Sequence, residues 1–152
     1  MLTLASSVSL TARSYALAKE SPLVWNYIKP KLTFDWVQRI ESPITPGFPD
    51  VHIIHEGSTI YVELKYCDSV TPTMGLRLEQ RNWHTRAARH GARSFLLLRM
   101  GKMLYLLPGY DLRDEFVSRE NFLSRAVFAS GVGSFDSDRL HDVLINWGKT
   151  NV

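Results

Sequence analysis

The sequence GFPDVHIIHEGSTIYVELK, residues 47–65, holds two short apolar runs, 51–55 and 59–62, separated by the polar segment 56–58. Two β-rich runs around a Gly-Ser turn predict a β-hairpin. Antiparallel pairing would bring Asp50, at the start of the first strand, beside the end of the second. Because side chains alternate along a strand, Glu63 and Lys65 are expected on the same face.

Two carboxylates and one ammonium group at the end of a hairpin suit phosphodiester chemistry. Carboxylate oxygens bind hard divalent cations such as Mg²⁺. Such a cation can polarise a phosphodiester and lower the pKa of a bound water. A neighbouring lysine can orient or deprotonate that water, or stabilise the charge that develops on the phosphate. The alternative is an ordinary hairpin on which Glu63 and Lys65 simply face solvent.

The same residues resemble a known nuclease signature. Pro49-Asp50, the interval of thirteen residues from Asp50 to Glu63, and the run 63–65 are similar to the PD-(D/E)XK motif. The Gly-x-Pro-Asp opening resembles the VRR-Nuc branch of that superfamily and the related archaeal and phage Holliday junction resolvases. Gln80 and Trp83 on the next expected helix add to the resemblance, which covers about residues 20–108.

The resemblance implies a metal site made of oxygen ligands. Asp50, Glu63 and the main-chain carbonyl of Leu64 would hold Mg²⁺ or Mn²⁺. Family members often add one more acid from the first helix, which makes Glu20 a candidate. Glu41, nine residues before Asp50, is the other candidate, and the sequence leaves this choice open.

The resemblance also implies roles for residues around the metal. Lys65 would position the attacking water, and Gln80 would help to hold it. Gln80 is expected on a helix over residues 74–90 that ends before Gly91, with a buried stripe of Leu76, Trp83 and Ala87. A surface position on that helix is the alternative for Gln80.

Arginines are the candidate nucleic-acid contacts. Several lie on the expected helix over 74–90, and one lies on the strand expected over 34–40. Arginines that line a groove beside a metal site can hold a phosphate backbone without reading its sequence. A solvated helix face is the alternative. The candidate residues are Arg39, Arg77, Arg81 and Arg86.

The remaining patterns predict an α/β fold, with a mixed sheet of about five strands flanked by helices. The resemblance implies that this sheet forms a PD-(D/E)XK, or restriction-endonuclease-like, core. Beyond the hairpin, strands are expected over 34–40, 92–100 and 103–107. Helices are expected over 22–28, 110–117, 121–128 and 138–147, with a glycine-rich loop over 130–134. We expect a single domain over 1–152, with the nuclease core at about 20–108 and a helical C-terminal extension at about 110–148.

Composition narrows the class of protein. The chain has 152 residues, a formal net charge of +3 and a pI near 9.1, which are compatible with a nucleic-acid partner. The single cysteine, Cys67, excludes an internal disulfide framework and a cysteine-based zinc site. No apolar run reaches the roughly 18 residues of a membrane span. We expect an intracellular, cytoplasmic protein, phage-encoded by analogy. Residues 1–19 fit either a short N-terminal element or a transit-like segment.

These observations lead to a functional hypothesis with two alternatives. The first is a Mg²⁺-dependent endonuclease that cuts branched or duplex DNA, as a homodimer where two symmetric cuts are needed. The second is a non-catalytic nucleic-acid-binding domain that kept the nuclease fold. The third is a sequence-specific enzyme of the restriction type. None of the five histidines has the spacing of a zinc site, although His84 lies one helical turn from Gln80.

Overall fold

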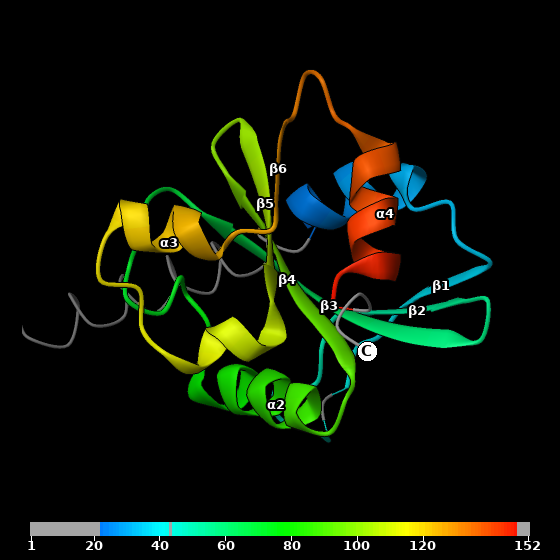
Figure 1. Cartoon of the computed structure of the whole chain (residues 1–152), viewed down its shortest axis with the longest axis horizontal. Coiled ribbons are helices and arrows are strands. Elements are labelled where there is room, and N and C mark those ends of the chain that lie inside the picture. The colour runs from blue at the N-terminus through cyan, green and yellow to red at the C-terminus, as the bar shows by residue number, and fades with distance from the viewer. Residues whose placement is uncertain (1–21, 43, 149–152) are drawn as a thin grey trace, which may run out of the picture.

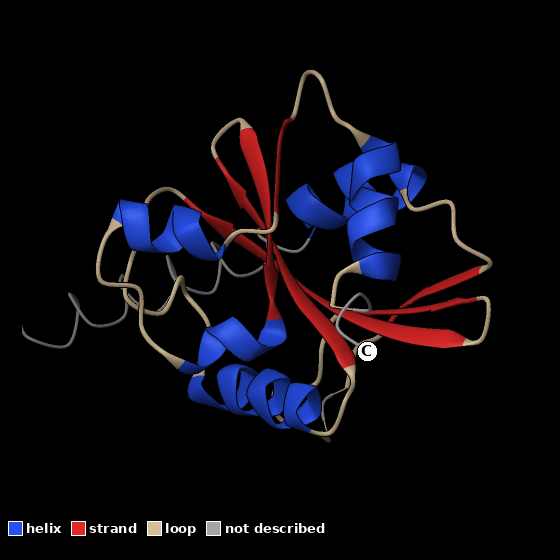
Figure 2. Cartoon of the chain, viewed as in Figure 1, coloured by secondary structure: helices blue, strands red, loops and turns tan. Residues whose placement is uncertain are grey.

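A computed structural model describes residues 22–42 and 44–148, and within them one mixed β-sheet forms the centre of the α/β fold (Figures 1 and 2). Its six strands lie in the order in which they occur along the chain. They are β1 (Trp36–Arg39), β2 (Val51–His55), β3 (Ser58–Cys67), β4 (Arg93–Met100), β5 (Met103–Pro108) and β6 (Phe128–Gly131).

The predicted hairpin is present, and one crossover follows it. β2 and β3 pair antiparallel with Val51 opposite Val62, which fixes the register around the motif. β3 and β4 are the parallel pair, with Glu63 opposite Leu96, and α2 (Leu78–Arg89) connects them. The other neighbouring strands pair antiparallel. The crossover therefore places α2 directly after the motif.

Helices cover both faces of the sheet (Figure 1). A helix over residues 22–28, extended by the 3₁₀ turn η1 (Lys29–Lys31), lies on one face together with α4 (Ser137–Asn146). The other face is covered by α2, the 3₁₀ helix η2 (Gly109–Arg113) and α3 (Arg119–Arg125). No helix in the described ranges is both long and apolar enough to cross a membrane.

β4 is buried on both faces, as its continuous apolar run predicts. Phe95 and Leu97 belong to the core under α4, whereas Leu96 and Leu98 belong to the core under η2 and α3. β3 supplies Val62 and Leu64 to the first core. Its alternate residues, including Glu63, therefore point to the face covered by α2.

The structure corrects the boundaries around the motif. β3 continues to Cys67, where the sequence predicts a loop from residue 66, because it pairs with β4 along its length. The helix predicted from residue 74 begins at Leu78. Met74 and Gly75 both have positive φ angles, of 51° and 75°, which no α-helix accommodates. The left-handed conformation of these two residues moves the start of the helix about one helical turn along the chain, to Leu78.

The C-terminal segment differs most from expectation. The sheet has a sixth strand, β6, formed by residues that were assigned to a helix end and a glycine-rich loop. The segment after Pro108 is therefore part of the sheet and is not an all-helical extension. The last helix agrees with prediction: the Asp136 side chain caps it by accepting from the Arg139 amide, and Leu140 and Leu144 enter the core.

Candidate active site

Asp50 lies at the first step beyond the β2–β3 ladder. The ladder ends at the pair Val51 and Val62, so the Leu64 amide has no main-chain acceptor on β2. The Asp50 carboxylate takes that place, since its Oδ2 accepts from Leu64 N at 2.9 Å. The main chain of Asp50 is also held, because its carbonyl accepts from Ile40 N at 2.6 Å. Asp50 is thus held through its side chain by β3 and through its main chain by Ile40, the residue after β1.

Glu63 lies in the interior beside Asp50, with 1% of the residue exposed. Gln80, in the first turn of α2, donates from Nε2 to Glu63 Oε1 at 2.5 Å. The other end of the same amide, Oε1, accepts from Arg77 N at 2.9 Å, as in the return half of a capping box. These two bonds fix the orientation of the Gln80 amide and join the start of α2 to Glu63. In this structure Gln80 is buried and orients the acid.

The two acids lie close enough to change the ionisation of one of them. The pKa of Asp50 is raised from 3.8 to about 7, chiefly by burial and secondly by the negative charge of the Glu63 carboxylate. The Leu64 N–H bond and the positive charges of Lys65 and Arg39 lower that pKa in part. Two carboxylates held together with too little compensating positive charge are a feature of functional sites.

Lys65 follows Glu63 on the same face of β3, and 8% of it is exposed. Gly75 lies beside it, and a Cβ placed there would be at an ordinary contact distance of 3.7 Å from Lys65 Cε, so the glycine is needed for its positive φ of 75° and not for space. The Lys65 charge lowers the pKa of Asp50, so its ammonium group lies within electrostatic reach of that carboxylate. The structure thus brings Asp50, Glu63, Lys65 and Gln80 together.

The loop before Asp50 is wedged against α2. Gly47 has φ of +81°, and a Cβ there would lie 2.2 Å from the carbonyl oxygen of Glu79. Phe48 packs against the ring of Trp83, with centroids 5.3 Å apart. Glycine is needed here for both its backbone angle and its small size. This contact sets the distance between Asp50 and the helix that carries Gln80.

A third acid does not join the pair within the described residues. Glu41 is exposed, and its carboxylate lies 3.8 Å from Arg39 in an ion pair. No group of three His, Cys, Asp or Glu side chains placed to hold a metal occurs in residues 22–42 and 44–148. Glu20, the other candidate, lies outside the described residues. Among the candidate metal ligands, the structure therefore brings together the carboxylates of Asp50 and Glu63.

His84, which the sequence distinguished from the other histidines only by its position one helical turn from Gln80, is a buried residue at the site. It is completely buried, and its Nε2 lies 3.9 Å from Glu63 Oε2. Burial lowers the pKa of His84 to about 4, although the charge of Asp50 opposes this. The imidazole is therefore neutral at physiological pH. The signal available in the sequence was its position, four residues after Gln80 on the same helix face.

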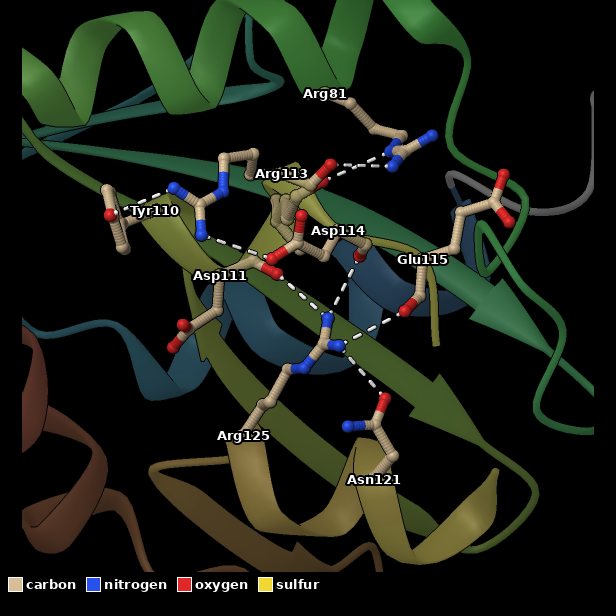
Figure 3. A network of polar contacts seen from close by, with 9 residues as sticks. Arg81, Tyr110, Asp111, Arg113, Asp114, Glu115, Asn121 and Arg125 are labelled. Carbon is tan, nitrogen blue, oxygen red and sulfur yellow. Dashed lines mark hydrogen bonds and ion pairs between the residues drawn. The ribbon is translucent and has the colours of Figure 1, made fainter. Parts of the chain in front are cut away.

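The four candidate arginines differ in availability. Arg77 and Arg86 are exposed on α2. Arg39 pairs with Glu41, and its guanidinium also lies 5.9 Å from the Trp25 ring. Arg81 donates to the carbonyls of the η2 segment, at 3.1 Å and 2.9 Å (Figure 3). Arg81 thus ties α2 to η2, which leaves Arg77 and Arg86 as the more accessible positive charges.

A separate pocket of about 340 Å³ lies near the C-terminal end of α2. Its walls are largely apolar and include Tyr110 and Trp147. None of Asp50, Glu63 and Lys65 lines it, so the pocket and the acidic site are different features.

Comparison with known proteins adds no assignment. No protein-family model matches the chain, and no curated protein is detectably similar to it.

Proposed function

We propose that this protein is a metal-dependent endonuclease of the PD-(D/E)XK type that hydrolyses phosphodiester bonds in DNA. The observation that carries the proposal is the juxtaposition of the half-buried Asp50 with the buried Glu63, adjacent to Lys65, with Glu63 oriented by Gln80. A purely structural role would not require two acids to be held together, largely shielded from water. The order of hairpin, motif and glutamine-bearing helix agrees with the resemblance described above.

The donors at the site fit a hard divalent cation. Carboxylate oxygens of Asp50 and Glu63 and the carbonyl oxygen of Leu64 are the ligand types that Mg²⁺ and Mn²⁺ take. The raised pKa of Asp50 also favours a cation site, because a cation between the carboxylates would offset both the burial of the Asp50 charge and its repulsion by Glu63. A divalent cation bound there would supply positive charge that polarises the phosphodiester.

The other residues of the site would act on the water and on the phosphate. Hydrolysis adds the hydroxyl group of water to phosphorus and gives a proton to the departing 3′ oxygen, which leaves 5′-phosphate and 3′-hydroxyl ends. Lys65 carries the charge that orients the attacking water and stabilises the negative charge of the transition state. Gln80 keeps the Glu63 carboxylate in one orientation, and Asp50 is kept in place by the Leu64 amide.

The proposed substrate is branched DNA, such as a four-way junction. Arg77 is the N-cap residue of α2, where its amide donates to the Gln80 side chain, and the exposed Arg86 lies further along the helix. These side chains can neutralise phosphates without contacting bases, which favours selection by DNA shape. Two symmetric cuts at a junction would require a homodimer.

A cleavage assay tests this proposal. Labelled four-way junction, flap, duplex and single-stranded DNA are incubated with the full chain and Mg²⁺ or Mn²⁺. We expect cation-dependent cleavage that is strongest on the junction. Asp50→Asn and Lys65→Met should each abolish cleavage and retain DNA binding, since both substitutions preserve side-chain size.

Matched controls separate loss of the site from loss of charge. Glu120→Gln and Lys102→Met remove the same charges at exposed positions on α3 and on the β4–β5 turn, and they should cleave as the wild type does. DNA binding without cleavage under any divalent cation would replace the proposal with a non-catalytic binding domain.

A further inference from the structure

Both oxygens of Glu63 face side chains of α2. Gln80 Nε2 donates to Oε1, and His84 Nε2 lies 3.9 Å from Oε2. His84 Nε2 is inaccessible to solvent and has no hydrogen-bond partner within the described ranges. A buried ring nitrogen that points at a carboxylate and makes no hydrogen bond calls for an explanation.

The other nitrogen of the same ring is strongly constrained. His84 Nδ1 makes a short hydrogen bond with Ser94 Oγ, and Ser94 on β4 is itself only 4% exposed. Gly109 leaves room for the serine hydroxyl, because a Cβ at that position would lie 2.6 Å from Ser94 Oγ. The His84 ring therefore has Ser94 on one side and Glu63 on the other.

The arrangement determines which nitrogen carries the proton. A neutral imidazole has one N–H and one lone pair, and the bond made by one nitrogen sets the state of the other. The N–H is favoured on Nε2, where it faces the negative charge of Glu63. Nδ1 then accepts from the Ser94 hydroxyl, which can rotate to donate. Serine is suited to this position because it supplies a donor in the interior.

We propose that His84 and Ser94 form a relay that positions Glu63, with the Ser94 hydroxyl holding His84 as the Nε2–H tautomer. His84 Nε2 lies 3.9 Å from Glu63 Oε2, which is too long for a hydrogen bond, but its N–H still attracts the carboxylate electrostatically. Glu63 is thereby oriented at both oxygens. The inference rests on the proposed function, since it assigns His84 as a positioning residue for a metal ligand. Such outer partners typically contribute about 10- to 100-fold in metal affinity.

The first test is the tautomer of His84 in the metal-free protein. Two-bond ¹H–¹⁵N correlation spectra distinguish an imidazole protonated at Nε2 from one protonated at Nδ1, and a His84→Asn spectrum assigns the signal. We expect the Nε2–H form in the wild type and a shift toward the Nδ1–H form in Ser94→Ala. A wild-type ring protonated at Nδ1 would overturn the inference.

The second test is Mn²⁺ affinity, measured by calorimetry without substrate. Ser94→Ala should raise the dissociation constant by about tenfold or more. Ser130→Ala is the matched control, because Ser130 is also a buried serine on the sheet and its hydroxyl accepts from the Asp136 amide. This control should lower stability and leave the Mn²⁺ dissociation constant within about twofold of the wild type.

The outcomes separate the relay from the nuclease proposal. If the wild type binds Mn²⁺ and Ser94→Ala binds it equally well, the relay is wrong and the metal site stands. If Ser94→Ala and Ser130→Ala weaken binding to the same extent, the effect is a loss of stability, and the relay is also wrong. If the wild type binds no divalent cation, the proposed function fails and the relay fails with it.

Discussion

Replacing Asp50 with asparagine should stabilise the metal-free protein at pH 8, although it removes a residue of the proposed active site. The asparagine side chain keeps an oxygen that can accept from Leu64 N, where the Asp50 carboxylate accepts at 2.9 Å. It removes the negative charge that burial and Glu63 disfavour. A substitution that removes a functional charge is expected to stabilise the protein where function has required two like charges to be held together.

The size of the effect follows from the pKa of Asp50. A change from 3.8 in the unfolded chain to about 7 in the folded protein corresponds to about 4 kcal/mol at pH values above 7. Between these pKa values the folded state binds more protons than the unfolded state, so the free energy of unfolding falls as pH rises. The buried amide still has to lose its water, so we expect a net gain of about 2–4 kcal/mol at pH 8.

Urea denaturation in EDTA, followed by circular dichroism, measures this gain. The advantage of Asp50→Asn over the wild type should be about 2–3 kcal/mol larger at pH 8 than at pH 5, because the folded-state carboxyl is mostly protonated at pH 5. Adding Mg²⁺ should stabilise the wild type more than the variant, because ligand binding favours the folded state.

Two results would refute this reasoning. One is a variant that is less stable than the wild type at pH 8. The other is a difference between the two proteins that does not change with pH. Either result would show that the Asp50 carboxylate is not held in the interior against a second acid.

Three further predictions concern the surroundings of the site. The free energy of unfolding of the Asp50→Asn variant should fall by about 3 kcal/mol as pH drops from 6.5 to 4, because over this range His84 takes up a proton more readily in the unfolded chain than in the folded protein. Urea midpoints measured across this pH range test the prediction, and a midpoint that does not change with pH would contradict it. Gly47→Ala should destabilise the protein by at least about 2 kcal/mol more than Gly57→Ala in thermal unfolding, because the two φ angles are alike and only a Cβ at position 47 would meet the backbone of α2. Equal losses of stability would contradict the close packing of Gly47 against α2. Arg81→Met should lower the free energy of unfolding by about 1–3 kcal/mol in the same assay, because the part-buried Leu112 carbonyl and the exposed Arg113 carbonyl lose their donor. An unchanged midpoint would show that these bonds are not needed.

The sequence predicted the parts of the fold whose signal is local. The hairpin, the buried strand β4 and α4 with its Asp136 cap all have a periodicity or a cap that can be read within a few residues. The parallel pairing of β3 with β4 follows from a helix between two strands. The grouping of Asp50 with Glu63 follows from hairpin pairing alone.

The features that were missed depend on distant contacts. β6 contains Ala129, Ser130 and Gly131, which have little strand preference, and it forms because β5 offers an open edge. The left-handed Met74 could not be anticipated, because a methionine rarely adopts a positive φ. The position of His84 near Gln80 could be read from the sequence, but its burial could not, because this depends on how α2 packs on β4, where Ser94 gives the ring a partner.

The most direct test of the central claim is a crystal structure of the wild-type protein soaked in Mn²⁺, with anomalous scattering used to locate the cation. We expect an anomalous peak bonded to carboxylate oxygens of Asp50 and Glu63 and to the Leu64 carbonyl oxygen. The peak should be absent in Asp50→Asn. A well-ordered site with no peak, or a cation bound elsewhere on the chain, would contradict it.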